Sequence, residues 1–361
     1  MNFLGKMFGG SRSQVVAGLD IGSANLKVAQ VRATGSGTEL VTLGGLPTPP
    51  EAMKNGAVID ATALGMAVAE LLEAARLGPG TRLVAAVAGS QVIIRPIIMN
   101  RVADRELAGA IRFEAERYLA YPVSQAQVYG IKLRDIDQKS METLLVAAPN
   151  EIISSAKEVI KVAQCTPEAI DLEPLVLRRA LKLCAPDKLQ RRVALINLGA
   201  AQSSINILRE GVLCHNRTIP MGGQSLTQAI GNNLNLPFDE AEKLKKLKGE
   251  VLLDTTPVAP AVKSVYNAIQ PVLDRLLTDL RRSLDYYHAT YKGESVDLLI
   301  LCGGTAQLKK LDAYLKKELQ IPCEIADPFV NMTMPKNSNL TRASLRELAP
   351  SAMTVIGLAL R

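Results

Sequence analysis

Alternating apolar and polar positions mark two hairpins of the same form, one in each half of the chain. Residues 16–28 form an apolar run, a tight Asp-x-Gly turn and a second apolar run, which predicts two short strands joined by a turn. Residues 193–205 repeat this pattern at identical spacing. The matching positions are Asp20 and Asn197, Gly22 and Gly199, and Lys27 and Ser204. A hairpin repeated in this way predicts an internal duplication.

The turns of these hairpins have the chemistry of a phosphate site. We expect Gly22 and Gly199 to adopt positive φ and to let the backbone approach a ligand closely. Successive backbone N–H groups in such turns form concave sites that suit phosphate oxygens. Two facing turns of this kind can hold the phosphates of a nucleotide, although each turn taken alone also fits an ordinary β-hairpin.

The pattern between the hairpins predicts a compact α+β module. A strand at 40–43, a Pro-rich turn at 47–50 and a helix at 62–77 come first. The module itself spans residues 81–165 and alternates strands and helices. Its expected elements are strands 83–87, 92–98, 128–133 and 143–148 and helices 104–119 and 150–164. After the second hairpin, helices are expected from Pro237 to Gly249 and from Ala261 to Tyr291.

Composition narrows the function classes. No run approaches 18 apolar residues and no signal peptide is apparent, so a cytoplasmic protein is predicted. The five cysteines are scattered and the two histidines lie far apart, which argues against a metal cluster. The net charge of +7 permits an anionic partner, but the lack of Trp and the few aromatics argue against nucleic acid. Residues 1–14 fit either a short interfacial anchor or a tail.

A third element changes the interpretation of the hairpins. Residues 297–308 form a buried-strand pattern that ends in Gly303-Gly304 and leads into the start of a helix at Thr305. Two phosphate turns and one such loop resemble the actin-like ATPase superfamily. Within it, the chain resembles the PilM family of type IV pilus assembly over nearly its whole length. The segments 88–90, 113–122 and 141–149 resemble the inserted subdomain that this family shares with the cell-division protein FtsA.

The resemblance implies an α/β actin-like ATPase fold with two lobes built from a duplicated βββαβα unit and an inserted FtsA-like α+β subdomain. The implied division gives residues 1–80, 166–192 and 345–361 to the core of the first lobe and 81–165 to the inserted subdomain. It gives residues 193–223 and 296–344 to the core of the second lobe and 224–295 to its helical subdomain.

The resemblance also implies a site for ATP and Mg²⁺. Asp20 is the expected metal-side carboxylate and a catalytic residue, and Glu173 in Glu-Pro is the expected water-positioning residue or base. The helix-start chemistry of Glu-Pro explains Glu173 equally well. The expected nucleotide contacts are Asp20, Gly22, Ser23, Ala24, Asn25, Lys27, Asn197, Gly199, Ala200, Gln202, Ser203, Gly222, Gly223, Glu242, Lys245, Gly303, Gly304, Thr305 and Leu308.

One departure from the superfamily pattern bears on hydrolysis. The second acidic position is Asn197 here, which can orient a water but attracts a cation less strongly than a carboxylate. ATP binding with slow or absent hydrolysis is therefore expected. A kinase of this superfamily needs an Asp near the acceptor hydroxyl, and the candidate is Asp171, which a helix start also explains.

By resemblance, the chain is an ATP-binding adaptor at the inner face of the cytoplasmic membrane. The implied partner is the N-terminal cytoplasmic tail of a PilN-like membrane protein, held between the first lobe and the inserted subdomain. Pilus motor ATPases, the platform protein and a second copy of the chain are further candidates. The alternatives are an active ATPase and an FtsA-like filament former in cell division. The closing helix ends at Arg361 without a following amphipathic segment, which argues against the filament former.

Overall fold

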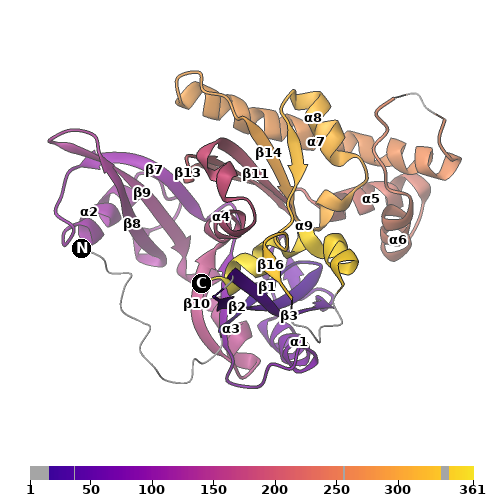
Figure 1. Ribbon diagram of the computed structural model, residues 1–361, viewed down its shortest axis with the longest axis horizontal. Helices are drawn as coiled ribbons and strands as arrows, with labels where there is room; N and C mark the ends of the chain where they lie inside the picture. The colour runs from indigo at the N-terminus through magenta and orange to yellow at the C-terminus, as the bar shows by residue number, and fades with distance from the viewer. Residues whose placement is uncertain (1–15, 36, 255–256, 335–340) are drawn as a thin grey trace.

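A computed structural model describes residues 16–35, 37–254, 257–334 and 341–361. The anchor or tail expected at residues 1–14 lies outside this part of the chain. Two lobes, each built on one sheet, make up most of the molecule, and a smaller module projects from one side (Figure 1).

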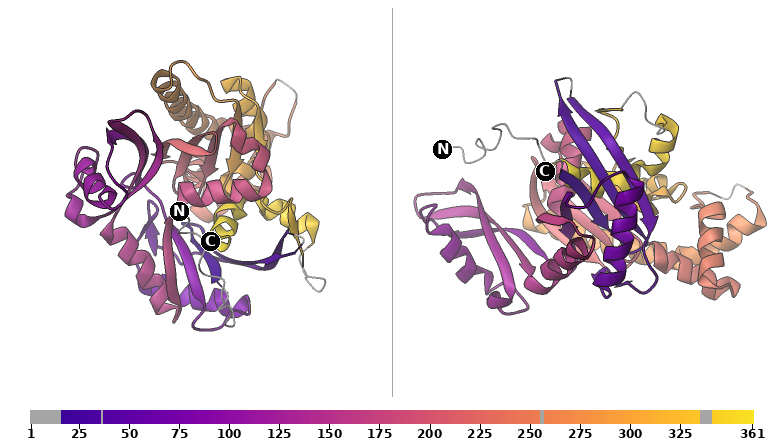
Figure 2. Two further views of the ribbon diagram at one scale, coloured as in Figure 1. Left: turned by 60° about the vertical axis from the view of Figure 1, so that its left-hand side comes forward. Right: turned by 90° about the horizontal axis from the view of Figure 1, so that it is seen from below.

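The first lobe is a six-stranded sheet in the order β10-β6-β1-β2-β3-β16. Helices α1 and α3 cover one face through buried residues such as Leu64 and Ile160, and α9 covers the other (Figure 2). The strands are β1 (Val16–Ile21), β2 (Asn25–Thr34), β3 (Gly37–Pro47), β6 (Arg82–Val87), β10 (Thr166–Leu172) and β16 (Met332–Thr333), and the helices are α1 (Ala61–Ala74), α3 (Asn150–Val162) and α9 (Arg342–Ala359).

The second lobe is a five-stranded sheet in the order β13-β12-β11-β14-β15. Four helices pack on one face, and α4 (Glu173–Cys184) packs on the other, between the two lobes. The strands are β11 (Arg192–Leu198), β12 (Ser203–Arg209), β13 (Val212–Ile219), β14 (Leu298–Cys302) and β15 (Cys323–Ile325), and the helices are α5 (Gly223–Leu234), α6 (Phe238–Lys248), α7 (Pro260–Thr290) and α8 (Leu311–Leu319).

The two sheets share one design, as the repeated hairpin predicts. In the first sheet, β1 pairs antiparallel with β2 and parallel with β6, and β2 pairs antiparallel with β3. In the second sheet, β11 pairs in the same way with β12 and β14, and β12 pairs antiparallel with β13. Even the register agrees, because Asp20 lies opposite Lys27 and Asn197 lies opposite Ser204. The duplicated α/β fold is therefore confirmed.

The projecting module is smaller than the expected segment 81–165. Its sheet is β7-β9-β8, with α2 (Leu107–Ala115) on one face. Its strands are β7 (Ile93–Asn100), β8 (Ala126–Asp135) and β9 (Ser140–Pro149). Two elements expected in it belong elsewhere, since β6 pairs with β1 and α3 packs on α1. The separate module therefore spans only residues 88–149, because the apolar faces of β6 and α3 are buried in the first lobe.

Short elements complete the chain. They are the hairpin strands β4 (Met53–Lys54) and β5 (Ala57–Val58) and the 3-10 helices η1 (Val123–Gln125), η2 (Pro186–Gln190) and η3 (Gly304–Gln307). Helix α1 ends at Ala74, before the expected stop at Gly78, because Arg76 adopts a left-handed φ of 58°. The amide of Leu77 then donates to Leu72, which closes the helix in the manner of a Schellman motif. Helix α2 is also shorter than the expected 104–119.

Candidate functional site

The first turn, between β1 and β2, is a tight backbone loop with free amides. The carbonyls of Gly22 and Ala24 accept hydrogen bonds from the hydroxyl and amide of Thr48, at 2.5 and 3.0 Å. The amides of Ser23 and Ala24 donate no hydrogen bond to any described residue. Adjacent unpaired N–H groups on a turn are suited to an anion. Asn25 follows the turn and begins β2, and its side chain is exposed.

The second turn, between β11 and β12, repeats this geometry. The amide of Gly199 donates to Gln202 O at 3.1 Å, while the amides of Ala200 and Ala201 are unpaired among the described residues. Neither Gly22 nor Gly199 has a positive φ, so that expectation is wrong. Glycine is needed for space instead, because a Cβ at either position would lie 2.6 Å from the carbonyl oxygen three residues later.

The start of α5 is tied to the second turn rather than open to a ligand. The amides of Gly223 and Gln224 donate to the carbonyls of Gly199 and Ala200 at 2.9 and 2.8 Å. A Cβ at Gly222 would lie 2.5 Å from the Ala200 oxygen. The Gly222-Gly223 pair therefore supports the turn, and the Gly223 amide is not available for a phosphate.

Two carboxylates lie close together at the turns. Lys27 Nζ donates to Asp20 at 3.0 Å, so this lysine neutralises the aspartate. Glu173, at the start of α4, accepts a hydrogen bond of 2.6 Å from Ser204. Burial raises the pKa of Glu173 and the charge of Asp20 adds to this rise, while hydrogen bonds from Ser204 and Asn197 oppose it. Asp20, Asn197 and Glu173 thus act on one another within one polar site.

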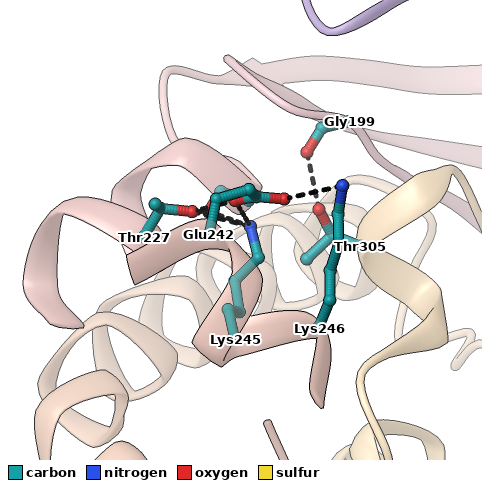
Figure 3. Close-up of polar contacts among 7 residues, drawn as sticks. Gly199, Thr227, Glu242, Lys245, Lys246 and Thr305 are labelled. Atoms are coloured by element: carbon teal, nitrogen blue, oxygen red, sulfur yellow. Dashed lines mark hydrogen bonds and ion pairs between the residues drawn. The ribbon is translucent and has the colours of Figure 1, made fainter. Parts of the chain in front are cut away.

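Glu242 and Lys245 form a hydrogen-bonded network with Thr227, which was not among the predicted site residues (Figure 3). Lys245 Nζ donates to Glu242 at 2.6 Å, to Thr227 Oγ1 at 2.7 Å and to Gly223 O at 2.9 Å. The Thr227 hydroxyl also donates to Glu242. Burial lowers the pKa of Lys245, against the influence of Glu242. Thr227 lies one helical turn after Gly223, which is the only sequence signal that could have identified it.

The Gly303-Gly304 loop lies directly against the second turn. Gly303 has a φ of +86°, and a Cβ there would lie 2.4 and 2.5 Å from Leu198 O and Asn197 Oδ1. Thr305 Oγ1 donates to Gly199 O at 2.8 Å (Figure 3). Gly304 in contrast has no atom within 4 Å of its Cβ position, so the loop has an open side.

Leu308 places the loop against α6. A Cβ at Gly249, just after this helix, would lie 2.9 Å from Leu308 Cδ1. The structure therefore brings the Gly303 loop, the end of α6 and the second turn together.

Two predicted phosphate contacts have other partners. Ser203 Oγ donates to Met221 O at 2.7 Å, inside the second lobe. The Gln202 side chain lies against Gly56 of the first lobe, whose Cβ position is 2.8 Å from Gln202 Nε2. Gln202 therefore makes a contact between the lobes rather than pointing along the turn.

Asp171, the residue considered for a phosphotransferase, is fully engaged. Its carboxylate accepts hydrogen bonds from Arg179 at 2.7 Å, from Arg361 at 2.9 Å and from the Leu172 amide at 2.8 Å. Because two guanidinium groups and an amide occupy its oxygens, this carboxylate is not free to contact an acceptor hydroxyl. Nothing in this geometry supports phosphotransfer to a hydroxyl.

The donor set is consistent with a metal held chiefly by a nucleotide. Among the described residues, no group of three or more His, Cys, Asp or Glu is placed to hold an ion. Mg²⁺ in nucleotide sites often takes one or two carboxylates and completes its shell with phosphates and waters. Asp20 fits that limited role.

In the same described part of the chain, every helix is too short or too polar to cross a membrane.

Two duplicated lobes around paired turns define a protein of the actin-like ATPase fold. The chain matches the family model "Type IV pilus assembly protein PilM" over residues 18–361, and it belongs to that family. It is similar to the solved structure of a PilM-PilN type IV pilus biogenesis complex. That match has a TM-score of 0.85 and 27% identity, and it covers 97% of this chain and 99% of the other.

More distant relatives share the fold. The cell division protein FtsA of Pseudomonas aeruginosa is 23% identical over 359 residues, which cover 88% of this chain and 84% of FtsA. FtsA of Bacillus subtilis is 24% identical over 269 residues, and the chain spans 60% of that protein's length. MreB5 of Spiroplasma citri bound to AMPPNP superposes with a TM-score of 0.53 at 12% identity, covering 96% of this chain and 95% of MreB5.

Proposed function

We propose that the protein is an ATP-binding adaptor of type IV pilus assembly. It binds the N-terminal cytoplasmic tail of a PilN-like membrane protein, and its affinity for that tail depends on the bound nucleotide. Such binding would hold it at the inner face of the cytoplasmic membrane. The proposal of nucleotide binding rests on the two turns, whose unpaired backbone amides follow Asp20 in one turn and Asn197 in the other.

In this proposal the parts of the site have separate tasks. The unpaired amides of Ser23, Ala24, Ala200 and Ala201 bind phosphate oxygens. Asp20 would orient the waters of a Mg²⁺ ion that the phosphates hold, and Lys27 balances the charge of Asp20. The open side of Gly304 and the edge of α6 receive the nucleoside, and a ribose hydroxyl would contact the Glu242–Lys245 pair by joining its network with Thr227.

Hydrolysis is expected to be slow or absent. Our proposal gives Glu173 the task of positioning a water, and a cavity that this residue lines has space for about one water molecule. Asn197 supplies no second negative charge to hold the metal hydration shell. Bound ATP then acts mainly to hold the lobes together.

The projecting module offers a surface for the tail. Tyr129 and Ile131 on β8 are 62% and 49% exposed, and both lie on the same face of an edge strand. An extended peptide can add to such an edge through main-chain hydrogen bonds, while alternate side chains contact the apolar pair. The similarity to a PilM-PilN complex supports a PilN-like tail as the peptide.

The test is a fluorescence-anisotropy titration. A labelled peptide of the cytoplasmic tail of the neighbouring PilN-like protein is titrated with the full chain, with and without Mg-ATP. Saturable binding with an affinity that depends on nucleotide supports the adaptor. The absence of binding in both conditions contradicts it and favours an active ATPase or an FtsA-like filament former.

Matched variants locate the contact. Ile131→Ser is expected to weaken peptide binding at least tenfold, because it removes an exposed apolar contact from the edge strand. Leu247→Ser, on the similarly exposed surface of α6, should leave peptide binding unchanged.

A further inference from the structure

A line of polar side chains crosses the buried face of the second sheet. Glu173 accepts from Ser204 at 2.6 Å, and Ser204 Oγ accepts from Asn206 Nδ2 at 3.1 Å. Asn206 Oδ1 in turn accepts from Asn216 Nδ2 at 2.6 Å. Every donor points toward Glu173, so the chain of hydrogen bonds has one direction.

The register of the sheet explains this line. Ser204 and Asn206 lie two residues apart on β12 and therefore face the same side, and Asn216 on β13 is the direct partner of Asn206. Asn206 is fully buried and Ser204 nearly so, at 0% and 6% exposure. Buried amides are costly unless paired, and Asn206 also donates to Leu195 O at 3.3 Å. A purely structural sheet would place apolar residues here, as this face does at Leu195 and Leu208.

Both ends of the line border the projecting module. Glu173 and Asn216 line the same water-sized cavity, together with Gly89 and Val92 in the connection from β6 to β7. Strand β13 also lies against β7 (Figure 1). Gly89 has a φ of +127° and no atom within 4 Å of its Cβ position, so the connection has room to shift.

We propose that Ser204, Asn206 and Asn216 form a relay that fixes the Glu173 carboxylate and transmits nucleotide binding at the two turns to the module of residues 88–149. A phosphate chain beside Asp20 changes the electrostatic environment of Glu173. Because Ser204 holds this carboxylate, any movement of Glu173 alters the bond to Asn206 and hence to Asn216. The coupling half of this proposal rests on the proposed function, whereas the positioning of Glu173 does not.

The first experiment tests positioning without nucleotide. The side-chain carboxyl carbon of Glu173 is titrated by ¹³C NMR in the full chain and in Ser204→Ala and Asn206→Leu. The relay predicts that both variants raise the apparent pKa of Glu173, although Asn206 does not touch it. Asn232→Ala, an exposed asparagine on α5, is the control and should change nothing. An unchanged titration in Asn206→Leu, with a wild-type circular dichroism spectrum, would overturn the relay.

The second experiment tests coupling. Hydrogen exchange of residues 88–149 is compared with and without Mg-AMPPNP in the wild type, Asn206→Leu and Asn216→Ala. The variants should bind the nucleotide within about threefold of wild type, yet lose at least half of the nucleotide-dependent change in exchange. Asn216 is partly exposed, so its variant serves if Asn206→Leu does not fold.

The outcomes separate the two claims. A full nucleotide response in both variants overturns the coupling while the proposed function stands. A wild type that binds no nucleotide contradicts the proposed function and the coupling together, and the titration then still decides whether the relay positions Glu173.

Discussion

At the scale of single residues, His215 on β13 is expected to make the folded protein less stable in acid. Its ring lies 5.0 Å from the ring of Tyr286, and its Nε2 is buried without a hydrogen-bond partner among the described residues. Burial lowers the pKa of His215 to about 4, and the charges of Arg217 and Arg95 act in the same direction. The unfolded chain therefore binds a proton more readily than the folded one.

We predict that His215 makes the protein lose stability as pH falls from about 6.5 to 4. The loss is at most about 3 kcal/mol, since each pKa unit corresponds to about 1.4 kcal/mol. His215→Phe keeps a ring against Tyr286 and should flatten the dependence of melting temperature on pH in this window. His288→Gln, at the exposed second histidine, should behave as wild type, and identical curves for all three proteins would contradict the prediction.

The adjacent glycines 303 and 304 provide a matched pair. Gly303→Ala forces a side chain into a left-handed conformation and against Leu198 O, so we expect a loss of about 2 kcal/mol or more. Gly304→Ala meets no atom within 4 Å and should change the unfolding free energy by less than about 0.5 kcal/mol. Chemical denaturation measures both, and equal losses would refute this description of the loop.

At this scale, the sequence predicted residues that are close together along the chain better than residues that meet only in the fold. Asp20, Gly22 and Asn197 could be proposed as site residues because their spacing is local and repeated. Thr227, Asn206 and Asn216 were missed because their roles depend on which residues become neighbours across strands and helices. The positive φ expected at Gly22 and Gly199 was wrong, since close approach to a carbonyl explains glycine there equally well.

At the scale of elements, α9 links the two lobes. Its carbonyls at Glu347 and Pro350 accept hydrogen bonds from Gln307 and the Gly303 amide, and its later turns pack on β1 and α4. The helix is therefore in contact with both the Gly303-Gly304 loop and the first sheet.

Gly18 on β1 makes that packing possible. A Cβ there would lie 2.5 Å from Val355 O and 2.6 Å from Ala359 N, both backbone atoms of α9. Gly18→Ala is expected to lower the unfolding free energy by about 1–3 kcal/mol. Gly109→Ala, on α2 with open space around it, should raise the unfolding free energy by about 0.5–1 kcal/mol, and thermal melts distinguish the two. A neutral Gly18→Ala would contradict the tight contact.

Periodicity located most of the longer helices and strands, but it missed β10 and β13 and could not say to which sheet a strand belongs. The strand at 82–87 has the same apolar pattern whether it joins the first sheet or the module, so the sequence could not assign it. Helix α1 shows a related limit, because a left-handed Arg76 ends it where no glycine signals the end.

At the scale of the whole molecule, binding and hydrolysis can be separated. Asp20→Ala removes the carboxylate proposed for the metal and should abolish pilus assembly in cells. Glu173→Ala removes the residue proposed to position a water and should leave assembly intact if bound ATP, rather than turnover, is what matters. Equal loss in both variants, with folding confirmed by circular dichroism, would support a working ATPase instead.

The central claim is that the two turns form one nucleotide site between the lobes. Isothermal titration calorimetry of Mg-ATP into the full chain tests it directly. We predict saturable binding at one site per chain, weakened at least tenfold, or about 1.4 kcal/mol, by Asp20→Ala. Asp239→Ala, an exposed acid on α6, should have no effect. No saturable heat in the wild type, or an affinity indifferent to Asp20→Ala, would contradict the account.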